Sequence, residues 1–209
     1  MVILLNCSFR GEKSNSNYFL ELVEKQLAKP CERISLNQVK DVSILKEKLK
    51  GADAVVFGMP LYVDSAPAQV VELMEKLYED GAGCLGELCV YVVSNLGFYE
   101  SRQIHIQFAI VRNWCERMGI TYGGGLAIGA GEMMGGLRKV PMDQGPNKAM
   151  GEGVKALATH ISMRSVMYDL YVEPTGFPRW MYFLAAQMNW APAAKKNGVK
   201  RRDVRRTRP

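Results

Sequence analysis

The chain has 209 residues, of which 48% are apolar and 23% charged, which is typical of a soluble globular protein with a sizeable core. At about 100–200 residues per domain, this length predicts one main domain. Eight of the 27 Lys and Arg residues, but only one of the 21 acidic residues, lie between Lys195 and Pro209. That segment therefore carries a net charge of about +7 and the rest of the chain about −1. The positive net charge of the protein thus lies in the C-terminal tail and not in the body.

Composition excludes several classes of protein. The five cysteines lack the spacing of a disulfide framework, and their odd number favours reduced thiols in the cytoplasm. With only two histidines a His-rich metal centre is excluded, and we expect no metal. No apolar stretch approaches the roughly 20 residues of a membrane span, and the first residues lack the features of a signal peptide. We expect a cytoplasmic protein.

Short apolar runs alternate with segments of helical periodicity along the chain. Residues 2–5 form an unbroken run typical of a strand covered on both faces, and a helical pattern follows until Pro30. We predict further strands at 33–36, 54–57, 88–93 and 126–128. We predict further helices with inward apolar residues at 44–49, 70–77, 104–118 and 154–161. Ser65 is expected near the cap of the second of these, with Pro67 in its first turn, and Gly119 is expected to end the third.

Strands that alternate with helices of this length predict an α/β fold with a doubly wound parallel sheet. Five strands fit the order 2-1-3-4-5. We assign residues 1–170 to this domain, 171–194 to an aromatic-rich C-terminal extension, and 195–209 to a basic tail expected to be disordered. Residues 129–147 are glycine-rich and expected to form a loop. In such sheets ligands bind beyond the carboxyl ends of the strands where the order reverses, here between the first and third strands.

The loop after the first strand, residues 6–16, gathers hydrogen-bond donors at the start of a helix. A helix N-terminus offers free N–H groups and about half a positive charge, which suits a phosphate. The candidate donors are Ser8, Arg10, Ser14, Asn15 and Ser16. An ordinary N-cap is the alternative interpretation, but three hydroxyls and an arginine exceed its needs. The glycines of nucleoside-triphosphate and dinucleotide loops are missing, so a single phosphate is predicted.

Two further loops follow the third and fourth strands. In residues 58–69, Pro60 fixes an extended backbone and leaves neighbouring N–H and C=O groups free, next to Leu61 and the flat ring of Tyr62. Residues 94–99, after the fourth strand, supply a third polar and aromatic turn over the same crevice. Prolines here could simply punctuate a helix start, but aromatic rings in turns are less easily explained by core packing. The three loops together predict a site for one ligand.

The three segments NCSFRGEKSNS, GMPLYVDSAPAQ and VSNLGFYE resemble those of the NAD(P)H-dependent FMN reductase family, whose fold is flavodoxin-like. The resemblance covers about residues 1–165. It implies that the first loop holds the FMN phosphate through Ser8, Arg10, Ser14, Asn15 and Ser16. It implies that the other loops border the isoalloxazine ring through Pro60, Leu61, Tyr62, Asn95, Gly97 and Phe98. The chain departs from the family at Cys7 and Phe9, where Gly and Pro are frequent.

The resemblance also implies an activity: hydride transfer from NADPH or NADH to FMN, and then reduction of a small electron acceptor such as a flavin or quinone. Such a reaction requires no catalytic acid, base or nucleophile in the protein. The second hypothesis is a flavodoxin-like electron carrier without its own nicotinamide reaction. Flavodoxins are usually strongly acidic, and a body near −1 disfavours this hypothesis.

The C-terminal segment carries two of the three tryptophans, in an apolar stretch from Phe177 to Trp190. Arg179, Gln187 and Asn189 interrupt it, so it does not span a membrane. We expect it to pack on the body or on a second subunit, because an aromatic strip needs covering and related reductases generally assemble as oligomers. Contact of the basic tail with an anionic membrane surface is the alternative that we do not favour, and we expect no specific nucleic-acid partner.

Overall fold

The computed structural model describes residues 1–203, apart from the side chains at 189–191 and 201. Its centre is a six-stranded sheet in the order β2-β1-β3-β4-β5-β6, in which all neighbouring strands are parallel. The strands are β1 (Val2–Asn6), β2 (Cys31–Ser35), β3 (Ala54–Pro60), β4 (Cys89–Asn95), β5 (Thr121–Ile128) and β6 (Leu170–Val172). The predicted order of the first five strands is confirmed, whereas the predicted number of five was wrong.

The sixth strand lies beside the carboxyl-terminal half of β5. Leu170 pairs with Leu126, and Val172 pairs with Ile128. With three half-buried residues it is too short to show a strand periodicity in the sequence. Because it extends the sheet at its edge, β6 directs the chain that follows it past the ends of β4 and β5.

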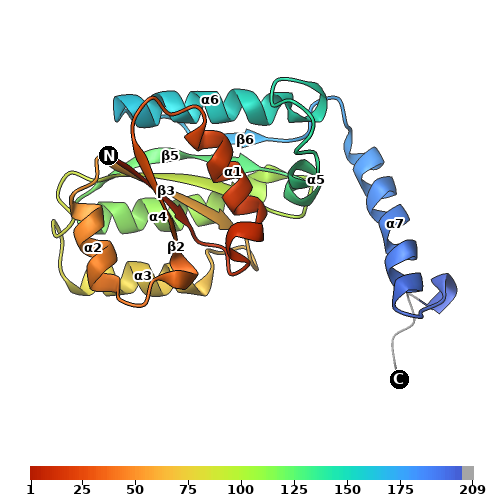
Figure 1. Cartoon of the computed structure of the whole chain (residues 1–209), viewed down its shortest axis with the longest axis horizontal. Coiled ribbons are helices and arrows are strands. Elements are labelled where there is room, and N and C mark those ends of the chain that lie inside the picture. The colour runs from red at the N-terminus through yellow and green to blue at the C-terminus, as the bar shows by residue number, and fades with distance from the viewer. Residues whose placement is uncertain (204–209) are drawn as a thin grey trace.

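Helices cover both faces of the sheet, as expected for a doubly wound fold (Figure 1). On one face α1 and α6 pack on the strands, and on the other α2, α3 and α4 do so. Their bounds are α1 (Asn15–Glu24), α2 (Val42–Lys50), α3 (Ala68–Glu79), α4 (His105–Met118), α5 (Gly131–Gly136), α6 (Lys148–Met163) and α7 (Arg179–Lys196). Short 3-10 turns lie at Gly11–Lys13, Leu36–Gln38, Ser101–Ile104, Gly145–Asn147 and Arg201–Asp203.

The ends of the helices follow from local chemistry. Asp41 caps α2 by accepting a 2.8 Å hydrogen bond from the Ser43 amide. Gly119 ends α4 in the left-handed conformation, which confirms its predicted role. Ser65 does not cap α3, because Pro67 is the residue before that helix and Ser65 instead pairs with Tyr62 in a tight turn.

Residues 129–147 are not entirely a loop, since they contain the short helix α5 and a 3-10 turn. Glycines at both ends of α5 lower its helix propensity, so the sequence pattern gave no signal for it. After β6 the chain leaves the body, and α7 projects away from it (Figure 1). α7 continues to Lys196, the second residue of the segment expected to be disordered, and residues 204–209 of that segment lie outside the described part. Within residues 1–203 no helix combines the length and the hydropathy needed to cross a bilayer.

Candidate functional site

The sheet brings the three predicted loops together where the strand order reverses. β1 lies next to β3, with Asn6 opposite Gly58, and β3 lies next to β4, with Pro60 opposite Asn95. The backbone amide of Cys7 donates to the Gly58 carbonyl at 2.8 Å. The loops after β1, β3 and β4 therefore begin side by side at one edge of the sheet.

Asn95 connects the three loops directly. Its side-chain amide donates to the Ser16 hydroxyl at 2.9 Å and to the Met59 carbonyl at 3.3 Å. Its backbone carbonyl accepts from the Leu61 backbone amide at 2.8 Å. Asn95 and Ser16 are both nearly completely buried. Since buried polar groups gain most from being paired, Asn95 stabilises the arrangement of all three loops relative to one another.

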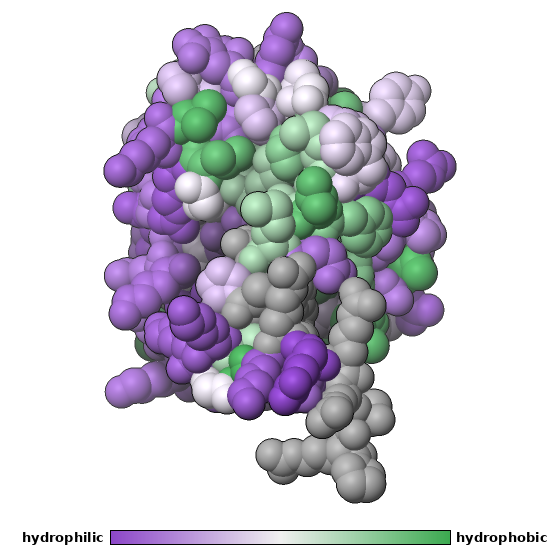
Figure 2. All heavy atoms as spheres, turned by 90° about the vertical axis from the view of Figure 1, so that its right-hand side faces the viewer, coloured by the Kyte–Doolittle hydropathy of each residue, from purple (hydrophilic) through white to green (hydrophobic). Residues whose placement is uncertain are grey.

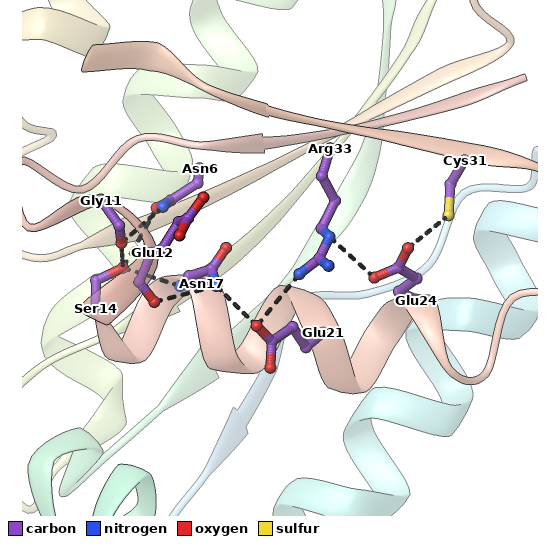
Figure 3. Close-up of polar contacts among 9 residues, drawn as sticks. All are labelled: Asn6, Gly11, Glu12, Ser14, Asn17, Glu21, Glu24, Cys31 and Arg33. Atoms are coloured by element: carbon purple, nitrogen blue, oxygen red, sulfur yellow. Dashed lines mark hydrogen bonds and ion pairs between the residues drawn. The ribbon is translucent and has the colours of Figure 1, made fainter. Parts of the chain in front are cut away.

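Two of the five predicted phosphate ligands are already used by the protein itself. The Ser14 hydroxyl donates to the Gly11 carbonyl at 2.7 Å and accepts from the Asn17 amide at 3.1 Å, which makes it the N-cap of α1 (Figure 3). The Asn15 side chain donates to the Gly131 carbonyl at 3.1 Å and so joins α1 to the start of α5. The N-cap interpretation therefore applies to Ser14, and Asn15 has a bridging contact.

The other three predicted ligands keep a donor available. The Ser8 and Ser16 hydroxyls accept hydrogen bonds, from the Arg10 amide and from Asn95, and each retains its own proton. In the described part of the chain, the backbone amides of Asn15 and Ser16 have no acceptor, as expected in the first turn of a helix. This donor set at a helix N-terminus fits a phosphate group such as that of FMN.

A hollow of about 620 Å³ lies between the first loop and β2 and is lined by Asn6, Lys13, Asn17, Glu21 and Arg33 among others. Its arginine is neutralised, because Arg33 contacts carboxylate oxygens of Glu21 and Glu24 at 3.2 Å each (Figure 3). Arg10, in contrast, is exposed and forms no ion pair with any described residue. Of the two arginines near the loop, Arg10 is thus the one whose charge remains for an anion.

At Cys7 and Phe9 the first loop differs from the family pattern that it resembles. Cys7 is completely buried in the core on the α3 side of the sheet, where its thiol donates to the Leu5 carbonyl. Burial raises the pKa of this thiol well above its usual range, so it stays neutral. Phe9 is 57% exposed.

The second loop is hydrogen-bonded to Gln107, a buried residue of α4 that the sequence analysis did not predict to be part of the site. Gln107 on α4 is fully buried and donates from its side-chain amide to the carbonyls of Pro60 and Ser65, at 3.1 and 3.2 Å. Its carbonyl oxygen accepts from the Ser94 hydroxyl. Gln107 lies three residues after Ile104, so it falls on the inward face of α4, and a polar residue at that position was a signal that could have been used.

The rim of the second and third loops is aromatic. Tyr62 is 42% exposed and Phe98 is 65% exposed, while Leu61 is half-buried. Gly97 is exposed, and a side chain at its position would meet open space. This arrangement offers flat apolar surfaces at the sheet edge that could accept a planar ring.

The base of α7 is attached to the third loop, which the sequence did not predict. Tyr182 donates from its hydroxyl to the Gly97 carbonyl, and burial raises its pKa, so it remains a donor. Its ring lies 5.8 Å from that of Tyr99, measured between centroids. The Tyr99 hydroxyl donates to the Phe177 carbonyl at 2.9 Å. The aromatic composition of residues 177–190 was the only signal for this contact.

Comparison with known proteins supports the fold. No protein-family model matches the chain, and no curated protein matches it by sequence. An NADPH-quinone reductase from P. pentosaceus shares 13% identity with a TM-score of 0.54, covering 77% of this chain and 95% of that one. An FMN-dependent NADH-azoreductase from Bacillus anthracis, solved with FMN, also shares 13% identity with a TM-score of 0.54, covering 77% and 99%. The chain has a flavodoxin-like fold.

A flavodoxin from Streptococcus pneumoniae is similar to the same degree, with 14% identity, a TM-score of 0.53, and coverage of 78% of this chain and 98% of that one. The reductases found in this comparison agree with the resemblance that the three loop segments indicated.

No group of three or more His, Cys, Asp or Glu side chains among residues 1–203 is arranged to hold a metal ion.

Proposed function

We propose that this protein is an FMN-dependent NAD(P)H oxidoreductase that reduces a small acceptor such as a flavin or a quinone. The observation that carries the proposal is the bonding of Asn95 to Ser16 and Met59, which joins the three predicted loops into one site. The fold shared with an FMN-dependent azoreductase and an NADPH-quinone reductase supports it. All five cysteines are free thiols, which supports a reducing compartment, and we place the reaction in the cytoplasm.

In this proposal the first loop binds the FMN phosphate. The backbone amides of Asn15 and Ser16, the hydroxyls of Ser8 and Ser16, and the Arg10 guanidinium donate to its oxygens. The side chains of Ser14 and Asn15 act on the shape of the loop through their contacts with Gly11 and Gly131. The positive end of the α1 dipole adds to the attraction for the dianion.

The second and third loops bind the flavin ring in this proposal. Pro60 and Leu61 are half-buried and Asn95 is buried beside them, while Tyr62, Gly97 and Phe98 are exposed. When bound, FMN would supply the hydride-accepting and electron-donating chemistry. The protein's part is to orient the ring, to leave one ring face open to a second planar molecule, and to hold the loops through Asn95 and Gln107.

A titration of flavin-free protein with FMN and with riboflavin tests the phosphate site. Arg10→Ala removes a charged donor at an exposed position, so we expect FMN to bind about tenfold more weakly and riboflavin to bind unchanged. Lys13→Ala is the matched control, because it removes a positive charge from the same loop at an exposed position. Quenching of flavin fluorescence reports both affinities. Wild-type protein that binds no FMN, or an equal loss for both flavins, would contradict the proposal.

The electron-carrier hypothesis is separated by a second measurement. Its support is the likeness to the pneumococcal flavodoxin. Under anaerobic conditions the reductase is expected to lose its flavin absorbance soon after NADH or NADPH is added, and to regain it when a quinone is added. An FMN-loaded protein whose spectrum persists with both nicotinamides would instead be a carrier.

A further inference from the structure

The outer face of α7 is apolar and uncovered. Trp180, Phe183, Leu184 and Met188 are each more than half exposed, at 66%, 52%, 55% and 67%. Trp180, Leu184 and Met188 are spaced four residues apart and Phe183 adjoins them, so all four lie on one side of the helix. Figure 2 shows apolar side chains gathered on the face of the molecule that α7 occupies in Figure 1. The structure therefore does not support packing of this strip on the protein's own body.

Among the described residues, the polar contacts with the body lie at the start of α7 and just before it. Tyr182 bonds to Gly97, Arg179 pairs with Glu100, and the Phe177 carbonyl accepts from Tyr99. Beyond Tyr182, no described side chain of α7 forms a hydrogen bond or an ion pair with the sheet or its covering helices. The helix is thus fixed at its base, with its apolar side available to another surface.

Charge identifies the kind of surface. The 18 residues of α7 include no Asp or Glu, and eight cations with a single acid follow between Lys195 and Pro209. A helix with Trp, Phe and Leu on one side, joined to a cluster of Lys and Arg, is the combination that binds at the interface of an anionic bilayer. At 1.5 Å per residue α7 is roughly 27 Å long, and it would lie along that surface.

We propose that α7 and the basic segment 195–209 bind the surface of an anionic lipid bilayer. Trp180, Leu184 and Met188 enter the boundary between headgroups and acyl chains, and the cations that follow lie against the lipid phosphates. A second copy of this chain is a poorer fit, because a body with a net charge of only about −1 offers little electrostatic attraction to the cluster of cations that follows α7.

Sedimentation of the full-length protein with vesicles tests this binding without any flavin. We expect it to bind vesicles of phosphatidylcholine mixed with phosphatidylglycerol, to release them as salt is raised, and to bind phosphatidylcholine alone weakly. Tryptophan emission should shift to shorter wavelength on binding. Trp114 is already buried, so the shift would report the tryptophans of α7.

Two variants with the same change isolate the apolar side of α7. Leu184→Glu places a negative charge in the apolar side of α7, where it opposes insertion into an anionic bilayer. It should weaken vesicle binding by at least about tenfold. Ile44→Glu makes this change at a similarly exposed position on α2, at 61% exposure, and should leave vesicle binding unchanged. Far-ultraviolet circular dichroism checks that both variants are folded.

The proposal is overturned if the full-length protein ignores anionic vesicles, or if it binds phosphatidylcholine alone equally well. Analytical ultracentrifugation without lipid tests the competing possibility, that a second copy of this chain covers the apolar side of α7. A dimer that Leu184→Glu dissociates, in a protein that does not bind vesicles, would show that a second copy covers α7.

Discussion

Replacing Asn95 with alanine tests whether one residue holds the three loops together. The substitution removes the bonds from its side-chain amide to the Ser16 hydroxyl and the Met59 carbonyl, at 2.9 and 3.3 Å. At about 1 kcal/mol for each net hydrogen bond, we expect the free energy of unfolding to fall by about 2 kcal/mol. Urea unfolding followed by circular dichroism measures this loss.

The same substitution should weaken FMN binding, because loops that are held together less firmly must be ordered when the ligand binds. A cost of about 2 kcal/mol corresponds to a Kd about 30-fold higher. Riboflavin should be affected similarly, since Asn95 links the ring loops as well as Ser16 of the phosphate loop. Flavin fluorescence quenching measures both dissociation constants at a temperature where the variant is fully folded.

Asn147→Ala is the matched control for this test. Asn147 is also buried, and its side-chain amide also donates two bonds to carbonyls, those of Leu137 and Val140 at 3.2 and 2.9 Å. It holds the turn before α6 and contacts none of the three loops. If Asn95→Ala binds FMN as tightly as the wild type, or if Asn147→Ala loses as much affinity, the reasoning is refuted.

Two further predictions concern stability. In Gly129→Ala the new Cβ would lie 2.1 Å from the Tyr99 carbonyl oxygen, so we expect the free energy of unfolding, measured in urea, to fall by about 2–3 kcal/mol. In the control Gly136→Ala the new Cβ meets open space, and the free energy of unfolding should not change. Burial raises the pKa of the Cys7 and Cys115 thiols well above the unfolded value of about 8.5. Unfolded thiols therefore lose protons first as the pH rises, and each thiol should cost about 1.4 kcal/mol of stability between about pH 7.5 and 9.5. Cys7→Ala should reduce the pH dependence by the roughly 1.4 kcal/mol that one buried thiol contributes, and an unchanged dependence would contradict the assignment.

Much of the fold could be predicted because its strands and helices carry strong local patterns. Most residues predicted to face inward, such as Val70 and Leu73 on α3, are buried in the structure. Ile44 at the start of α2 is an exception, since it is 61% exposed. The missed elements, β6 and α5, have three and six residues. Their formation depends on pairing with β5 and on the contact of Asn15 with Gly131, both of which join segments far apart in the sequence.

The candidate site shows a similar division. Its location followed from the topology, because the carboxyl ends of adjacent parallel strands must meet. The separate roles of the loop residues did not follow, since Ser14 and Ser16 are the same residue type two positions apart. Ser14 caps α1, while Ser16 receives a bond from Asn95 on another strand. Only the three-dimensional arrangement distinguishes a hydroxyl that shapes the loop from one that can still donate.

The rim of the site bears on the choice between a reductase and a carrier. A carrier meets protein partners, and complementary charge speeds and orients such encounters. The second and third loops, residues 58–69 and 94–99, contain a single charged residue, Asp64, and the body as a whole is close to neutral. A reductase instead has to admit two small planar molecules in turn to one ring face. Exposed rings such as Tyr62 and Phe98 beside an open Gly97 provide for stacking and not for charge pairing, which favours the reductase.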